Sequence, residues 1–191
     1  MSSPAPRRII LCADDYGLSP GVNKAILELI ARGRINATSV MTVAPAFDRE
    51  SSSALQDAAR EKDCQIGLHL TLTAPFRPLT MHFRPLHGDT FLPLKRLLGA
   101  SLLRRLDRVM LQAEISAQLA AFERMFGRAP DYVDGHQHVQ AFPQVRDAFL
   151  AAVSDAAPKA WIRVPDPPLR LTNQVEPDGR KTAASNLPSP S

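Results

Sequence analysis

The chain has 191 residues, of which 45% are hydrophobic and 22% are charged, and this composition is typical of an ordinary globular domain. It has no run of about 18 apolar residues, so we expect no membrane span. Its formal net charge is +4, but no zinc finger, aromatic RNA-binding motif or basic repeat accompanies that charge, so we expect no nucleic-acid partner. Because the N-terminus lacks the apolar core of a signal peptide, we expect a cytoplasmic location.

The first third of the chain predicts a strand, a helix and a second strand. The apolar run 7–13 is suited to a buried parallel strand, in which Cys12 acts as a small hydrophobic residue. After a polar turn, Ser19 is placed to cap a helix with apolar residues at helical spacing, and Gly33 is placed to end it. The segment 37–43 is rich in β-branched residues, which favour a strand.

The middle of the chain combines a third strand with an unusually long connection. A weaker helix is predicted at 48–61, and the segment 65–72 predicts a strand. The stretch 74–93 contains four prolines, and we expect it to be either a functional loop or disordered. The segment 94–108 then combines leucines with Lys and Arg at helical spacing. Its charges are interpreted as a solvated helix face, with contact to an acidic lipid or an anionic substrate as the alternative.

The last third continues the alternation of helices and strands. A long amphipathic helix is predicted to end at Gly127, and the segment 131–138 predicts a strand that runs into a loop. A helix at 143–153 and a fifth strand at 160–164 follow. Strands that alternate with helices predict an α/β fold with a parallel sheet.

Carboxylates and histidines occur at the ends of three predicted strands. They are Asp14 and Asp15 after the first strand, His69 in the third, and Asp134, His136 and His138 at the end of the fourth. Because the carboxyl ends of parallel strands share one edge, we expect these side chains to converge in one cleft. One carboxylate and two imidazoles form a mixed site suited to Zn²⁺ and other divalent ions, with positions left for water and substrate. A second carboxylate beside the first can act as a general base.

Each of these residues also has a purely structural interpretation. The adjacent aspartates resemble a turn and helix-capping device, and His69, between two leucines, is compatible with a hydrogen-bonded core residue. His136 and His138 alternate, so in an extended segment both would point to the same face, which favours the metal interpretation. The two histidines of the proline-rich loop are expected on the surface.

Five segments of the chain form an ordered set. They are ADDYGLSPGVNKAI (13–26), GRINATSVM (33–41), IGLHLTLT (66–73), EISAQLAAFERMFGRAPDYVDGHQHV (114–139) and, more weakly, IRVP (162–165). In this order they resemble the YdjC-like family, which includes the chitooligosaccharide deacetylases. The resemblance covers most of residues 8–165. Each segment alone is only modestly specific for the family, but the ordered set is quite specific.

The resemblance implies an irregular (β/α) barrel of the polysaccharide-deacetylase type that hydrolyses the N-acetyl group of an amino sugar. It implies that Asp15, His69 and His136 bind a divalent metal, Mg²⁺ or Zn²⁺, and that Asp14 is the proton acceptor. His138 lies in the same element, where it is expected to bind substrate or to donate a proton to the leaving amine. The expected partner is a small carbohydrate.

Two departures from the family pattern leave other interpretations open. Gln140 stands where the family commonly has a third histidine, and residues 166–191 form a polar tail, expected to be disordered, after a domain of residues 1–165. We therefore expect a barrel that is incomplete at its C-terminus and a homo-oligomer as one outcome of its open edges. The alternatives are a metal-dependent hydrolase of another bond, such as a phosphoester, and a catalytically degenerate sugar-binding remnant.

Overall fold

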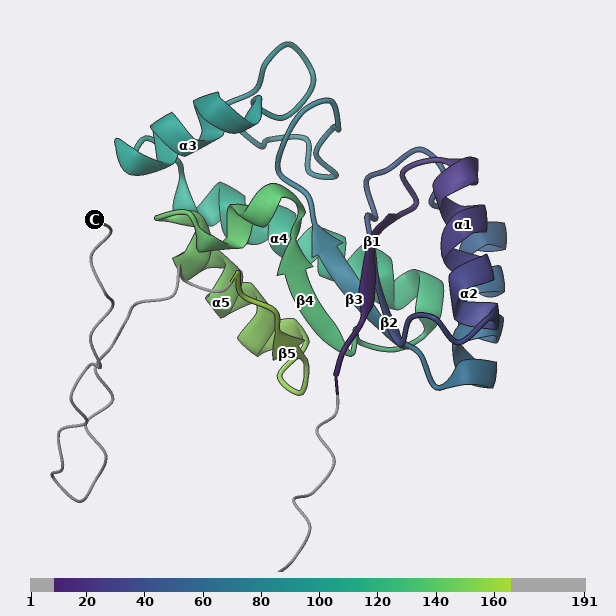
Figure 1. Cartoon of the computed structure of the whole chain (residues 1–191). Helices are drawn as coiled ribbons and strands as arrows, with labels where there is room; N and C mark the ends of the chain where they lie inside the picture. The colour runs from purple at the N-terminus through teal and green to yellow at the C-terminus, as the bar shows by residue number, and fades with distance from the viewer. Residues whose placement is uncertain (1–8, 166–191) are drawn as a thin grey trace, which may run out of the picture.

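The computed structural model describes residues 9–165, which form an α/β fold around one parallel sheet (Figure 1). The five strands are β1 (Cys12–Tyr16), β2 (Ala37–Val40), β3 (Gln65–Leu70), β4 (Tyr132–Gly135) and β5 (Trp161–Ile162). They lie in the order β1-β2-β3-β4-β5, and every neighbouring pair is parallel. This sequential order is that of a (β/α) barrel wall, whereas a doubly wound sheet reverses its order. The predicted fold class is confirmed.

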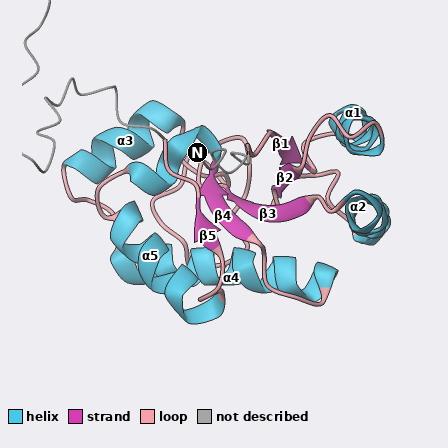
Figure 2. Ribbon diagram, turned by 60° about the horizontal axis from the view of Figure 1, so that its bottom comes forward, coloured by secondary structure: helices cyan, strands magenta, loops and turns pink. Residues whose placement is uncertain are grey.

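Helices cover the sheet in the same order as the strands. They are α1 (Pro20–Ala31), α2 (Arg49–Lys62), α3 (Leu94–Leu102), α4 (Arg108–Phe126) and α5 (Val145–Ala156), with a 3₁₀ segment η1 (His136–Ala141). Helix α1 packs on α2, α2 on α4, and α4 on α5. Figure 2 shows α1 and α2 beside the β1–β2 end of the sheet, and α4 and α5 beside the β4–β5 end. No helix among residues 9–165 combines the length and apolar character that crossing a membrane requires.

Local sequence signals begin and end several of these helices. The Ser19 hydroxyl accepts a hydrogen bond from the backbone N–H of Val22, and a proline occupies the first helical position of α1. Asp48 and Ser51 form a reciprocal capping box at the start of α2. Helix α4 ends at Gly127, whose φ of 68° is a left-handed conformation that glycine adopts without penalty.

The core lies between the sheet and the helices that follow it. Leu68 of β3 is fully buried between its register partners Val40 and Val133 on the neighbouring strands. Gly67 has no room for a side chain, because an added Cβ would lie 2.5 Å from the ring of Tyr132. The Tyr132 ring itself stacks on Trp161 at a centroid distance of 4.4 Å. This close packing holds β3, β4 and β5 together.

Three sequence predictions about local structure need correction. Strand β1 begins at Cys12, and residues 9–11 before it are exposed and outside the strand. His136 and His138 do not lie in an extended segment: they belong to η1, and Gln137 and His138 have left-handed backbones. The predicted strand at 37–43 is shorter, because β2 ends at Val40. The predicted polar tail, 166–191, lies outside the described residues.

Candidate metal centre

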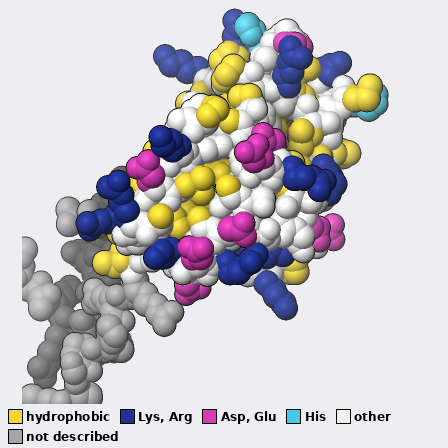
Figure 3. Space-filling view, turned by 90° about the vertical axis from the view of Figure 1, so that its right-hand side faces the viewer, with side chains coloured by type: hydrophobic (Ala, Val, Ile, Leu, Met, Phe, Trp, Pro, Cys, Tyr) yellow, Lys and Arg dark blue, Asp and Glu magenta, His cyan; other side chains and the backbone are white. Residues whose placement is uncertain are grey.

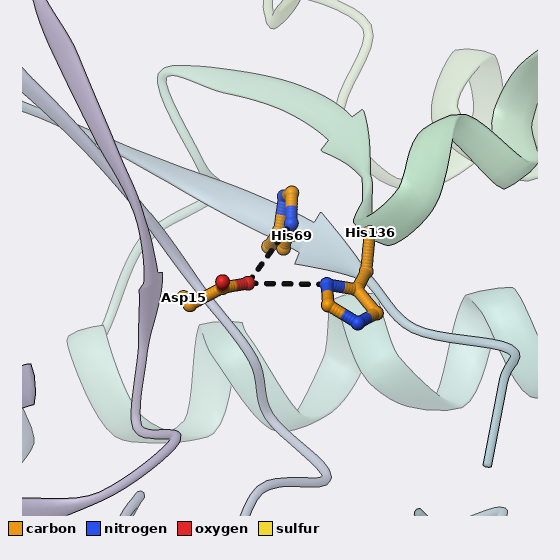
Figure 4. Close-up of side chains that lie close together, drawn as sticks. All are labelled: Asp15, His69 and His136. Atoms are coloured by element: carbon orange, nitrogen blue, oxygen red, sulfur yellow. Dashed lines mark hydrogen bonds and ion pairs between the residues drawn. The ribbon is translucent and has the colours of Figure 1, made fainter.

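The carboxyl ends of β1, β3 and β4 bring together Asp15, His69 and His136 (Figure 4). Asp15 Oδ1 lies 3.3 Å from His69 Nε2 and 3.1 Å from His136 Nδ1. One ligand atom from each side chain lies within 4.8 Å of the other two. These are the three residues that the sequence predicted as metal ligands, and the fold places them around one point.

The adjacent aspartates both reach this site because β1 is irregular. In a regular strand, Asp14 and Asp15 would point to opposite faces of the sheet. The pairing of β1 with β2 changes register between Ala13 and Tyr16, and Asp15 has a left-handed backbone with a φ of 69°. Bulges of this kind redirect side chains beside functional sites. As a result, each carboxylate forms a compact group that includes His69.

The donor set and its spacing suit a divalent ion. Nitrogen and oxygen ligands bind Zn²⁺ at about 2.0–2.2 Å, so ligand atoms around one tetrahedral ion are separated by roughly 3–4 Å. The distances from Asp15 Oδ1 to the two imidazole nitrogens, 3.3 Å and 3.1 Å, fall in that range. Three protein ligands leave coordination positions for water and for a substrate oxygen.

Hydrogen bonds shift the pKa values of His69 and Asp15. Burial by itself would lower the pKa of His69, but hydrogen bonds to Asp134 and Asp15 outweigh burial and raise that pKa to about 9. Hydrogen bonds to His136 and His69 hold the pKa of the Asp15 carboxyl well below its ordinary value. Asp15 is therefore ionised at neutral pH, which is the state in which a carboxylate binds a metal.

Asp134 supports His69 from the other side of the ring. Its Oδ1 lies 2.6 Å from His69 Nδ1, and only 1% of its surface is exposed. The two residues are register partners on β4 and β3. A carboxylate on the second nitrogen orients a ligating imidazole and fixes its tautomer. The sequence placed Asp134 at the end of a strand, two residues before His136, but gave no sign of this pairing.

Asp14 lies among hydrogen-bond donors and outside the group of Asp15, His69 and His136. It accepts hydrogen bonds from Arg163 at 2.6 Å, from Ser39 at 2.9 Å and from the Cys12 thiol at 3.2 Å. Burial would raise the pKa of the Asp14 carboxyl, but the hydrogen bond from Arg163 and the charge of His69 outweigh burial and lower it. The predicted proton acceptor is therefore ionised and adjacent to the ligand group.

Arg163 is a residue of the site that sequence reasoning missed. Its Nη2 bonds to Asp14 and also lies 2.5 Å from Asp134 Oδ2, as an ion pair without the alignment of a hydrogen bond. Asp14, His69 and Asp134 form a second compact group of possible ligands, but both of its carboxylates already pair with the Arg163 cation. The only sequence signal was the weak IRVP match, which includes this arginine.

His138 and Gln140 lie apart from the three ligand residues. His138 is exposed and lines a cavity of about 210 Å³ together with Asp14, Asp134 and Arg163. Gln140 is buried, and its amide donates to the backbone carbonyl of Arg163 at 3.1 Å. The position that departs from the family pattern therefore contacts Arg163, the residue directly after β5. The catalytic role assigned to His138 stays a prediction.

A comparison with known protein families identifies the chain. The model of the family described as YdjC-like protein matches residues 8–189, which is nearly the whole sequence. The chain belongs to the YdjC-like family. The resemblance predicted from the ordered segments is thereby confirmed.

Two individual proteins are similar to this YdjC-like chain. A carbohydrate deacetylase from Homo sapiens is 32% identical over 157 residues, which cover 80% of this chain and 47% of that protein. A solved structure from Enterococcus faecalis, assigned to cellobiose-phosphate cleavage, is 25% identical and has a TM-score of 0.63. The similarity covers 77% of this chain and 55% of the solved chain. The YdjC-like chain thus spans about half the length of these relatives.

A cavity of about 640 Å³ adjoins the ligand residues of this YdjC-like chain. His136 lines it together with Phe76 and Arg77 of the long connection after β3 and with Leu18 and Val43. The Phe76 ring meets the His136 ring edge-on, with centroids 6.1 Å apart and planes at 87°. Its lining is largely apolar with a few polar groups, as in many small-molecule sites.

A larger cavity than this one lies elsewhere among the described residues. It measures about 830 Å³, is lined mainly by residues of α1 and α2, and contains none of the predicted site residues. Figure 3 shows the side of the molecule that carries these helices, where hydrophobic side chains lie among charged ones. Cavity volume therefore does not single out the region that holds the predicted site residues.

Proposed function

We propose that this chain carries the metal site of a carbohydrate deacetylase, which removes the N-acetyl group from an N-acetylated amino sugar or oligosaccharide. The observation that carries the proposal is the convergence of Asp15, His69 and His136, with His69 supported by Asp134. Membership of the YdjC-like family and the similarity to a protein named carbohydrate deacetylase support the reaction and the sugar substrate. The proposed ion is Zn²⁺ or Mg²⁺.

The protein groups around the ligands have distinct roles in this proposal. A divalent ion held by Asp15, His69 and His136 would supply Lewis-acid activation of water and of the acetyl carbonyl. Asp14 accepts the proton of the attacking water, because Arg163 keeps its carboxylate ionised. The amine leaves as the amide C–N bond breaks and acetate forms, and it receives a proton from His138 at the rim of the smaller cavity.

The first experiment measures metal binding by the full chain with isothermal titration calorimetry. We expect the wild type to bind one Zn²⁺ or Mg²⁺ ion per chain and the His69→Ala and His136→Ala variants to lose that binding. The matched controls are His82→Ala and His87→Ala, because both histidines are exposed and outside the ligand group. Full affinity in His69→Ala, or no affinity in the wild type, would exclude the proposed site.

A second experiment separates deacetylation from the alternatives. Acetate release from N,N′-diacetylchitobiose is measured beside phosphate release from a phosphorylated sugar, with the same metal-loaded protein. Acetate release that disappears in Asp14→Asn, while metal binding persists, supports the proposal. Phosphate release alone would favour a phosphoesterase. Metal binding without either product would favour a sugar-binding remnant.

A further inference from the structure

A buried carboxylate outside the metal centre carries a further inference. Glu114 lies on α4, has no exposed surface, and accepts four hydrogen bonds. The donors are the backbone N–H groups of Leu79 and Thr80, at 3.0 and 2.9 Å, the Thr80 hydroxyl at 2.7 Å and the Gln118 amide at 2.9 Å. All four of these groups are hydrogen-bond donors, which is the pattern that an ionised carboxylate requires.

Gln118 extends the same contact by one helical turn. It donates from Nε2 to the Thr71 carbonyl at 2.8 Å, and it accepts from the Thr71 backbone N–H at 3.1 Å. Residues four apart lie on one face of a helix, so Glu114 and Gln118 act together. The Glu114–Gln118 pair therefore holds both ends of the segment 71–80, which follows directly after β3.

The segment held in this way forms a wall beside the metal centre. Between its two held ends, Phe76 packs edge-on against His136 and Arg77 lines the same cavity of about 640 Å³. Phe76 is 7% exposed, so its ring is part of the core as well as of the cavity. The position of the His136 ring thus depends on a segment whose backbone is bonded to α4.

Burying this carboxylate is costly, because a buried charge needs hydrogen bonds to replace those of water. Two apolar side chains would pack the segment 71–80 against α4 without that cost, but they would not fix which backbone groups meet the helix. The three directed hydrogen bonds from Leu79 and Thr80 to Glu114 do fix that register. Among the described residues, no cation is paired with Glu114, so its hydrogen-bonding capacity is directed to the segment and to Gln118.

We propose that Glu114 is a positioning residue, which fixes the segment 71–80 as a rigid wall of the substrate cavity and thereby orients His136 through Phe76. Where it concerns metal and substrate, this inference rests on the proposed function. The positioning itself is a property of the metal-free chain. It is therefore testable without metal or substrate.

The test uses Glu114→Gln in the full chain, with Glu123→Gln as the matched control. Glutamine has the same shape, but its amide nitrogen would face hydrogen-bond donors where a carboxylate oxygen now accepts. Glu123 lies on the same helix and is exposed. We expect Glu114→Gln to raise the hydrogen-exchange rates of the Leu79 and Thr80 amides by about tenfold or more, the loss expected for hydrogen bonds to a charged group.

Two further measurements connect the wall to His136. Nuclear magnetic resonance of the metal-free chain should show the His136 ring-proton resonance shifted in Glu114→Gln, since the Phe76 ring current acts on it. Zn²⁺ affinity should fall by about two- to tenfold, the range expected for loss of an aromatic edge contact. Phe76→Leu should shift the His136 resonance and weaken Zn²⁺ binding while leaving the Leu79 and Thr80 amides protected.

The outcomes distinguish the two proposals. Unchanged hydrogen-exchange rates of the Leu79 and Thr80 amides in Glu114→Gln would overturn the positioning role. Faster exchange of these amides with an unchanged chemical shift of the His136 ring proton would also overturn it. If the variant does not fold, Thr80→Val is used in its place, because it removes only the hydroxyl donor, and Thr80→Ser should restore protection. A wild type that binds neither Zn²⁺ nor Mg²⁺ would end the proposed function, while the exchange and resonance measurements would still decide the positioning role.

Discussion

His69 lies between two carboxylates, with Asp15 on its Nε2 side and Asp134 on its Nδ1 side. Only the first is a predicted metal ligand, but the second determines how the ring is oriented. Asp134 is almost fully buried and also meets the Arg163 cation. At the scale of single residues, the site therefore depends on a carboxylate that would not touch the ion.

The Asp134→Asn variant tests this dependence. Asparagine keeps the size of the side chain but removes the negative charge beside His69. We expect Zn²⁺ affinity to fall by about ten- to a hundredfold, as for other residues that support a metal ligand. Calorimetric titration measures the change, with the exposed Asp155→Asn as the control. Equal affinities in the two variants would contradict the supporting role of Asp134.

The sequence was sufficient to predict that Asp15, His69 and His136 lie together, but not which residues support them. Asp15, His69 and His136 could be predicted because they follow strands, and parallel strands end at one edge. Arg163 could not be predicted as a partner of Asp14, since their contact joins positions 149 residues apart and depends on how β5 is placed. The bulge that directs Asp15 into the site likewise leaves no hydrophobic pattern in the sequence.

At the scale of elements, helix α2 begins with a titratable cap. The Asp48 side chain accepts a hydrogen bond from the Ser51 backbone N–H at 2.8 Å, and the Ser51 hydroxyl accepts one from the Asp48 backbone N–H at 2.9 Å. Hydrogen bonds from Ser51 lower the pKa of the Asp48 carboxyl from its ordinary 3.8. The stability that this cap contributes is therefore present above that ordinary value and is lost as the pH falls through the lowered pKa.

The Asp48→Asn variant should consequently lose less stability in acid than the wild type. Asparagine caps a helix about as well as aspartate but does not titrate. We expect the two melting temperatures to be similar at neutral pH and the variant to melt higher than the wild type at a pH well below 3.8. Asp48→Ala should melt lower than both at neutral pH. If the melting temperatures of the wild type and Asp48→Asn fall equally as the pH is lowered, the prediction is contradicted.

Packing between β3 and β4 permits a second test at this scale. A Cβ on residue 67 would lie 2.5 Å from the Tyr132 ring, which cannot move freely because it stacks on Trp161 and its hydroxyl meets the Cys12 thiol at 2.9 Å. Gly67→Ala should therefore destabilise the fold by about 1–3 kcal/mol. Urea unfolding measures the change. The control is Gly99→Ala in α3, where space is open and alanine should stabilise the helix by roughly 0.5–1 kcal/mol.

At the scale of the whole molecule, the described residues form an open wall of five strands. Among them, β1 pairs only with β2, and β5 only with β4. Exposed edges of this kind favour association with another chain unless they are covered. The alternation of strands and helices was sufficient to predict this fold class, because the spacing of apolar residues in the sequence changes from each strand to the next helix.

We expect this chain to associate with itself at high concentration through the β1 edge. Ile9, Ile10 and Leu11 precede the strand and are 71%, 49% and 57% exposed, which places an exposed apolar segment next to this edge. Size-exclusion chromatography with light scattering should show a mass that rises with concentration. Ile10→Lys should reduce the rise, because a charged edge resists pairing. A monomer of constant mass in both proteins would contradict the prediction.

Asp15, Gln137 and His138 all have left-handed backbones, with φ of 69°, 55° and 59°. A residue other than glycine pays roughly 1 kcal/mol or more for this conformation. Laboratory evolution for heat resistance rewards only the folded fraction, so it should enrich glycine at these positions. At Gln137, which is exposed and lines the cavity beside His136, that gain would leave both groups of possible metal ligands intact. At Asp15, glycine would remove the carboxylate that both imidazoles share. Thermostable descendants of this chain should therefore be tested for metal binding as well as for melting temperature.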